Sequence, residues 1–139
     1  MKPLAGKTAI ITGAAAPRGI GRATALRLAE DGATVVLTDI AGLLKIDGAE
    51  IQKLDLLTEL ATEISNSGGQ ALALEVDVSK AADIETCVST AQEHFGGIDI
   101  LVNNAGTTIG TGAFLDSTCD EWQKSFQINL LGPMMFCQT

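Results

Sequence analysis

Short apolar runs alternate with amphipathic segments along the chain, and this alternation is the feature that most constrains its fold. The runs cover residues 8–12 (TAIIT), 34–38 (TVVLT), 71–76 and 98–102. Their apolar residues are largely continuous instead of alternating with polar ones. Strands of this kind have both faces covered, as in a parallel sheet with helices on each side. The sequence therefore predicts an α/β fold.

The segments between these runs have the three- and four-residue spacing of helices. Helices are expected from residue 20 to about 31, over 54–64, from a plausible N-cap at Ser79 to Gly96, and from Thr118 onward, where Thr118 and Glu121 have the spacing of a capping box. Residues 42–50 (GLLKIDGAE) are a polar, glycine-punctuated stretch to which no helix or strand is assigned. The order βαβαβαβα predicts a Rossmann-like doubly wound sheet of which only the first four strands are present.

Composition excludes several classes of function. Acidic residues outnumber Lys and Arg by 17 to 9, and the formal net charge of −8 makes nucleic acid an unexpected partner. One histidine and three cysteines without metal-ligand spacing give no expectation of a metal site. No apolar stretch approaches the roughly 20 residues that span a bilayer, and the N-terminus has no signal-peptide pattern. We therefore expect no membrane partner and a cytoplasmic location.

The first strand leads into the stretch TGAAAPRGIG, residues 12–21, which suits a phosphate-binding turn. Gly13 permits a tight turn, Gly19 permits close approach to a pyrophosphate, and Gly21 allows the helix to pack on the strand. Asp39 ends the second strand, where a carboxylate accepts hydrogen bonds from a ribose. Dinucleotide oxidoreductases, nucleotide-sugar epimerases and adenosyl-cofactor methyltransferases share this layout, so the pattern predicts a nucleotide site without deciding among them.

Five motifs together resemble the short-chain dehydrogenase/reductase family. They are Thr12-Gly13 with Gly19-Ile20-Gly21, then Asp39, Asp77-Val78, the tetrapeptide NNAG at 103–106, and FQINLLGP at 126–133. The match extends from about Lys7 to the end of the chain. It implies that residues 1–139 are the N-terminal portion of an NAD(P)-binding Rossmann domain.

The resemblance also implies roles for single residues. Asn129 would be the catalytic asparagine, which kinks its helix and anchors a water in a proton relay. The cofactor-binding residues would be Thr12, Gly13, Gly19, Ile20 and Gly21 at the pyrophosphate, Asp39 at the adenine ribose, Asp77 and Val78 at the adenine, and Asn103, Ala105 and Gly106 beside the fourth strand.

The expected cofactor is NAD rather than NADP. Asp39 would repel the 2′-phosphate of NADP at short range. Arg18 lies where NADP-preferring members of the family often carry a basic residue, so Arg18 favours NADP. Five residues separate Gly13 from Gly19, where the family usually has three, and residues 42–50 look like extra length with no assigned task.

The family's catalytic Ser and Tyr-x-x-x-Lys are not found, and the sequence contains no tyrosine. We therefore expect the N-terminal part of an oxidoreductase that transfers hydride between a nicotinamide and a secondary alcohol or ketone, inactive by itself. A non-catalytic dinucleotide-binding or assembly module is the alternative, and an adenosyl-cofactor methyltransferase is a weaker one. The resemblance further implies a homo-oligomer, dimer or tetramer.

Overall fold

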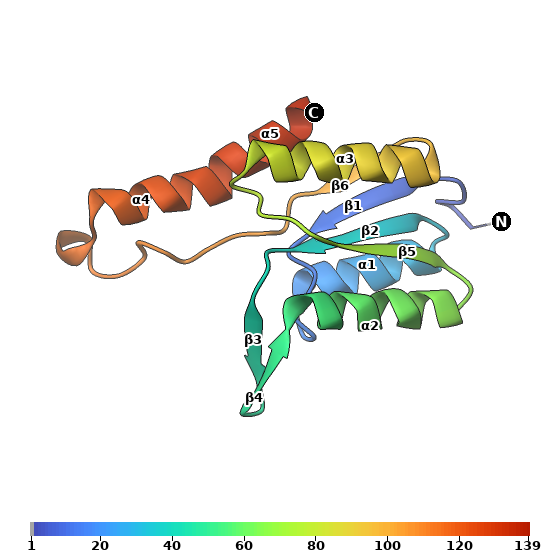
Figure 1. Cartoon of the computed structure of the whole chain (residues 1–139), viewed down its shortest axis with the longest axis horizontal. Coiled ribbons are helices and arrows are strands. Elements are labelled where there is room, and N and C mark those ends of the chain that lie inside the picture. The colour runs from blue at the N-terminus through green and yellow to red at the C-terminus, as the bar shows by residue number, and fades with distance from the viewer. Residues whose placement is uncertain (1) are drawn as a thin grey trace.

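A computed structural model describes residues 2–139 as a four-stranded parallel sheet with helices on both faces (Figure 1). The strand order is β5-β2-β1-β6, with Ile10 opposite Val36 and Leu101. The sheet strands are β1 (Thr8–Thr12), β2 (Thr34–Asp39), β5 (Gln70–Glu75) and β6 (Ile100–Val102), and the main helices are α1 (Ile20–Glu30), α2 (Lys53–Asn66) and α3 (Ala81–Phe95). The predicted Rossmann-like sheet of four strands is confirmed.

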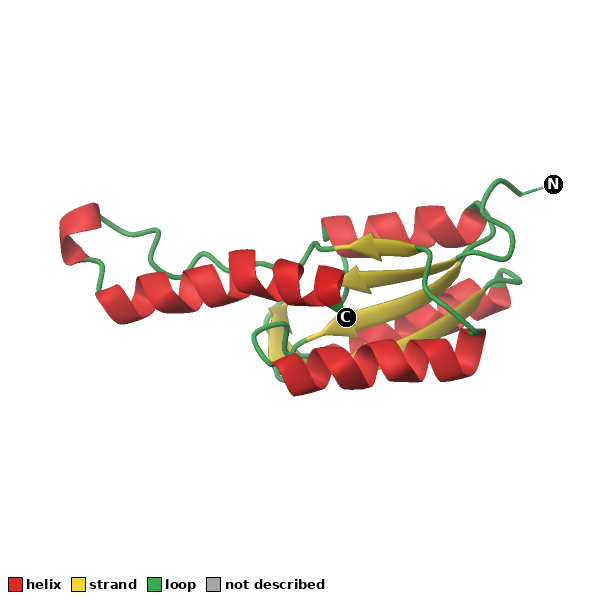
Figure 2. Ribbon diagram, turned by 90° about the horizontal axis from the view of Figure 1, so that it is seen from above, coloured by secondary structure: helices red, strands yellow, loops and turns green. Residues whose placement is uncertain are grey.

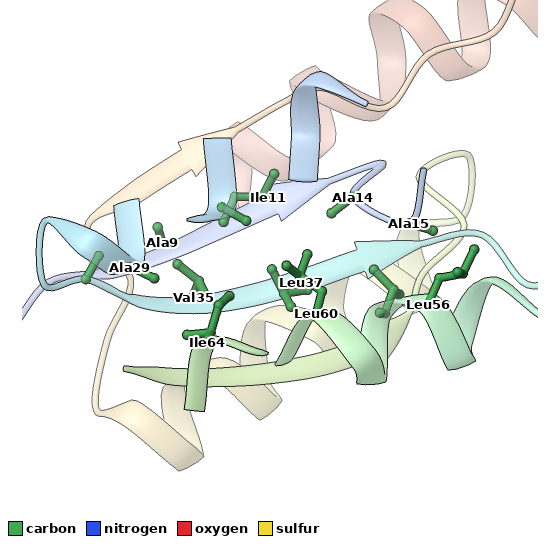
Figure 3. Packing of buried hydrophobic residues seen from close by; sticks show 13 residues of the cluster. Ala9, Ile11, Ala14, Ala15, Ala29, Val35, Leu37, Leu56, Leu60 and Ile64 are labelled. Carbon is green, nitrogen blue, oxygen red and sulfur yellow. The ribbon is translucent and has the colours of Figure 1, made fainter. Parts of the chain in front are cut away.

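Two apolar layers hold the helices on the sheet, because successive strand residues point to opposite faces. On one face, Ile11 and Leu37 are fully buried beneath α1 and α2, with Leu60 of α2 against them (Figure 3). On the other face, Ile10 and Val36 lie beneath α3. Burial of each large aliphatic side chain contributes about 1.5–3 kcal/mol. The continuous apolar runs are thus explained by a sheet that is covered on both sides.

The connection after β2 contains two strands, which were not expected in residues 42–50. It forms an antiparallel hairpin of β3 (Leu43–Ile46) and β4 (Ala49–Gln52) that projects from the sheet (Figure 1). Both turn residues have positive φ, 48° at Asp47 and 88° at Gly48. An Asp-Gly pair in this conformation is typical of a two-residue hairpin turn. The predicted βαβαβαβα order was therefore wrong at this point.

The starts of helix α3 and of strand β6 also differ from expectation. Helix α3 begins at Ala81 with Lys80 as its N-cap, so Ser79 is not the cap. Strand β6 begins at Ile100, and the carboxylate of Asp99 just before it accepts hydrogen bonds from the backbone N–H of Thr8 and from Lys7 Nζ, 2.6 Å away.

The last helix is continuous but contains a π-helical turn in its middle. Helix α4 (Cys119–Phe126) begins with the predicted capping box, a π-helical turn covers Gln127–Leu131, and α5 (Gly132–Gln138) follows. α4 extends beyond the sheet, as Figure 2 shows, and several large apolar side chains along this segment are exposed, among them Phe126 and Met134. Across residues 2–139, no helix combines the length and hydropathy needed to cross a bilayer.

Candidate nucleotide site

The glycine loop joins β1 to α1 at the carboxyl edge of the sheet, and its glycines lie in close contact with their neighbours. Gly13 has φ of 70°, and a Cβ there would lie 2.9 Å from Ala105 Cα. A Cβ on Gly21 would lie 2.6 Å from the Gly13 carbonyl oxygen, and one on Gly19 would lie 3.0 Å from Ala16. The expectation that Gly21 allows the helix to approach the strand agrees with this geometry.

The longer loop is accommodated because the two residues that follow Gly13 are buried. Ala14 and Ala15 are 0% and 1% exposed, and Ala14 N donates to Thr38 O at 2.9 Å. Gly19 N donates to Ala16 O at 2.9 Å, which closes a tight turn before the helix. The five residues between Gly13 and Gly19 therefore form an ordered loop anchored to β2.

The N-terminus of α1 is open. Gly19 is its N-cap, no side chain caps it, and its first turn contains no acidic residue. The first amide groups of a helix have no partner within the helix, and together with the helix dipole they favour an anion. Ile20 is 79% exposed beside this end, and Arg18 is also exposed.

Thr12 has a different position from the one its predicted role suggests. It is 1% exposed, and its hydroxyl accepts hydrogen bonds from Asn104 N at 3.0 Å and Ala105 N at 2.9 Å while donating to Val102 O at 3.3 Å. The Asn104 amide donates to the carbonyls of Thr12 and Gly13. The Thr12 hydroxyl is thus occupied in joining β1 to β6, and the Asn104 amide links the ends of the same two strands.

Asp39 lies beside the glycine loop at the end of β2. Its Oδ2 accepts a hydrogen bond from Ala15 N at 3.1 Å, and its Oδ1 accepts from Ile40 N at 2.9 Å and from Lys53 Nζ at 3.0 Å. Sequence reasoning missed both Ala15 and Lys53 as neighbours of this carboxylate. The Asp-Gly pair in the hairpin was the available signal for Lys53, because the hairpin returns the chain to the end of β2.

Asp77 and Val78 follow β5 at the same edge. Asp77 Oδ1 accepts from Ser79 N at 3.0 Å and from Ser79 Oγ at 2.6 Å, and Lys80 Nζ lies 3.4 Å from Oδ2. Partial burial opposes ionisation, but the bonds from Ser79 and the Lys80 ammonium outweigh it and hold the pKa of Asp77 below its usual value. Val78 is 8% exposed. The turn is therefore rigid and carries an ionised carboxylate.

Asn129 sits in the π-helical turn and holds the loop that follows β6. Its Oδ1 accepts from Thr107 N at 2.8 Å, and its Nδ2 donates to Thr107 O at 2.9 Å. A Cβ on Gly106 would lie 3.3 Å from Asn129 Oδ1, so the backbone passes close to this amide. Asn103 is exposed, and Ala105 is half-buried. Asn129 therefore lies in a π-helical turn, where the helix departs from regular α-helical hydrogen bonding.

The predicted residues thus come together because parallel strands end at one edge of the sheet. β1, β2, β5 and β6 supply the glycine loop, Asp39, Asp77-Val78 and Asn103–Gly106, respectively. In α/β sheets of this kind, ligands bind at the carboxyl ends of the strands. Within the described residues, no three His, Cys, Asp or Glu side chains gather in a group that could hold a metal ion.

A parallel sheet with a glycine-rich loop, an uncapped helix and an acid at the end of β2 is typical of nucleotide-binding α/β proteins. The comparisons specify the family. The short chain dehydrogenase family model matches residues 7–139, and the chain belongs to that family.

Several relatives illustrate the match. The diacetyl reductase [(S)-acetoin forming] of Staphylococcus epidermidis is 40% identical over 132 residues, which are 95% of this chain and 46% of the relative. A short-chain type dehydrogenase/reductase from Mycobacterium marinum has a TM-score of 0.81 and 34% identity, covering 97% of this chain and 49% of that one. A blue fluorescent protein from a metagenomic library, solved in complex with NADPH, has a TM-score of 0.81 and 32% identity, covering 98% and 50%. The chain spans about half the length of the curated relatives it matches.

Proposed function

We propose that residues 1–139 are the NAD(P)-binding part of an oxidoreductase that transfers hydride between a nicotinamide and a secondary alcohol or ketone. The observation that carries the proposal is the open N-terminus of α1 behind a glycine loop, with Asp39 beside it. The glycines let the loop pack closely, because a Cβ at Gly13 would lie 2.9 Å from Ala105 Cα and one at Gly19 would lie 3.0 Å from the Ala16 carbonyl oxygen. The amides of the first turn of α1 have no side-chain cap and are the groups that suit a pyrophosphate.

The residues that would hold the cofactor are those placed at the carboxyl edge. The amides of the first turn of α1 would bind the pyrophosphate, Asp39 would accept from the adenine ribose, and Asp77-Val78 would lie against the adenine. The cofactor supplies the hydride when it is bound. Asn129 fixes the loop after β6 through Thr107, which positions the wall of the site next to Asn103, Ala105 and Gly106.

We favour NAD as the cofactor, because Asp39 stands where the 2′-phosphate of NADP would lie. The exposed apolar residues on α4 and α5 support association into a homo-oligomer, which stays a prediction, as does the cytoplasmic location. The whole protein's substrate is expected to be a small alcohol or ketone, in keeping with the family.

Isothermal titration of the chain with NAD⁺ and with S-adenosylmethionine tests this proposal. NAD⁺ is expected to bind, and S-adenosylmethionine is not. Gly19→Val puts a branched side chain against Ala16, where even a Cβ would lie 3.0 Å away, so it is expected to displace the amides at the start of α1 and to weaken NAD⁺ binding at least tenfold. Gly112→Val is the control, because Gly112 has open space around it. Equal NAD⁺ affinity in both variants would contradict the proposed site.

The absence of tyrosine favours the non-catalytic alternative for the chain by itself. A general acid or base of suitable pKa is needed for alcohol oxidation, and the family's tyrosine is not available to supply it. Incubation of the chain with NAD⁺ and a panel of secondary alcohols is therefore expected to give binding without formation of NADH.

A further inference from the structure

We propose that Lys53 is a specificity-determining residue at the adenosine end of the site: it offsets the charge of Asp39 and offers donors to a 2′-phosphate, so that NADP is bound almost as well as NAD. This inference rests on the proposed function and refines its cofactor preference. It assigns a task to the inserted hairpin, which delivers Lys53 to Asp39.

The hairpin fixes the position of Lys53. Strands β3 and β4 return the chain to the end of β2, where Lys53 N donates to Gly42 O at 2.9 Å. Leu44 and Ile51 of the hairpin pack against the apolar layer that contains α2, which holds the hairpin in place. Lys53 is the first residue of α2, so its backbone is held from both sides.

The ion pair is well placed to act on a bound nucleotide. Lys53 Nζ lies 3.0 Å from Asp39 Oδ1, and the two side chains are 22% and 13% exposed. A partly buried pair of this kind is screened less by salt than a surface pair. Because the carboxylate is compensated at contact distance, its repulsion of a second negative group is much smaller than Asp39 alone would cause.

The hydrogen-bonding capacity of Asp39 leads to the same conclusion. Each carboxylate oxygen has about two acceptor positions. Both positions of Oδ1 are taken, by Ile40 N and Lys53 Nζ, and one position of Oδ2 is taken by Ala15 N. One acceptor position therefore remains for a ribose hydroxyl, so Asp39 has less capacity to select a diol over a phosphate ester than a free carboxylate has.

Lys53 retains capacity of its own. An ammonium has three N–H donors, and Asp39 is the one side chain among the described residues that Lys53 is hydrogen-bonded to. A group that binds Asp39 Oδ2 lies within about 8 Å of Lys53 Nζ, given ordinary hydrogen-bond lengths and the width of a carboxylate. Arg18, exposed on the glycine loop, adds a second positive charge at this edge of the sheet.

The test compares 5′-AMP with adenosine 2′,5′-bisphosphate, which differ by the 2′-phosphate, and NAD⁺ with NADP⁺. Titration of the wild-type chain is followed by Lys53→Met and Lys53→Arg. Lys45→Met is the matched control, because it removes the same charge from an exposed position on the same hairpin. Loss of one positive charge at about 6 Å from a phosphate corresponds to roughly a tenfold loss in affinity.

In Lys53→Met, affinity for the bisphosphate and NADP⁺ is expected to fall about tenfold, while affinity for AMP and NAD⁺ changes less than about threefold. Lys53→Arg and Lys45→Met are expected to keep the wild-type ratio. An unchanged ratio in Lys53→Met overturns the inference and leaves the proposed function intact. Failure of the wild-type chain to bind either AMP or NAD⁺ overturns both.

A measurement on the wild-type chain covers the case in which Lys53→Met fails to fold, as judged by circular dichroism. Raising the salt concentration from low to high is expected to weaken binding of the bisphosphate more than binding of AMP, because a 2′-phosphate held by cations is sensitive to screening. Parallel salt dependence for the two ligands contradicts the proposal.

Discussion

Replacing Thr12 by valine tests the link between β1 and β6. Valine has nearly the same shape as threonine but lacks the hydroxyl, so the change removes three hydrogen bonds without opening a cavity. We expect the variant to fold but to be markedly less stable than the wild-type chain.

The magnitude follows from which groups lose their partners. Asn104 N keeps a second acceptor, Val102 O at 3.0 Å, so its loss is that of an ordinary hydrogen bond, about 0.5–1.5 kcal/mol. Ala105 N has the Thr12 hydroxyl as its acceptor at 2.9 Å, and leaving it unsatisfied costs about 1–3 kcal/mol. The free energy of unfolding should therefore fall by about 2–4 kcal/mol, which corresponds to a decrease in Tm of about 8–15 °C for a chain of this size.

Urea unfolding followed by far-UV circular dichroism measures this difference. Thr12→Ser is the control, because it keeps the hydroxyl and loses only a buried methyl group, at a cost of about 1 kcal/mol. Thr12→Ser should also bind NAD⁺ as the wild type does. If Thr12→Val proves as stable as Thr12→Ser, the hydroxyl does not hold the two strands together and the reasoning fails.

Two further predictions concern packing and pH. Gly21→Ala puts a Cβ 2.6 Å from the Gly13 carbonyl oxygen and should lower the free energy of unfolding, measured in urea, by about 1–3 kcal/mol. Gly97→Ala is the control, because Gly97 has open space around it, and it should change stability by less than about 0.5 kcal/mol. Equal effects of the two substitutions would refute the contact at Gly21. Burial raises the pKa of the Cys87 thiol from 9.0 to about 11, so the folded state favours the neutral thiol: stability is fully present below pH 9 and should fall by roughly 3 kcal/mol as the pH rises to about 11. Cys87→Ala should abolish that part of the alkaline loss, and an unchanged pH profile in the variant would contradict it.

The main elements of the sheet could be predicted because local pattern and tertiary environment agree there. Residues 8–12 and 34–38 are apolar and rich in β-branched side chains, and they are buried on both faces as expected. Helix ends marked by glycine were also predictable, since Gly96 has the left-handed conformation that glycine favours at a C-terminal cap. The boundaries were less accurate where a polar side chain has a tertiary partner, as Asp99 does with Lys7.

The candidate site was predictable in its residues but not in their hydrogen bonds. The motif placed Thr12 next to the glycines, which suggested a contact with the pyrophosphate. The structure shows that its hydroxyl is directed at the backbone after β6, more than ninety positions along the chain. Periodicity within a segment contains no information on such partners, because they depend on which strands become neighbours in the sheet.

The same reasoning applies to the cofactor preference. An acid at the end of the second strand indicates NAD only if no nearby positive charge offsets its repulsion of a 2′-phosphate. Whether such a charge is present depends on which side chains lie within a few ångströms of the acid. Lys53 is fourteen positions beyond Asp39, and the two meet because a hairpin turns at Asp47-Gly48. A hairpin that adds no group to the reaction can therefore bring in a lysine that offsets the negative charge of Asp39. For this chain the selectivity between NAD and NADP should depend on both members of the Asp39–Lys53 pair. Removing Lys53 should shift the preference toward NAD, and removing Asp39 should shift it toward NADP.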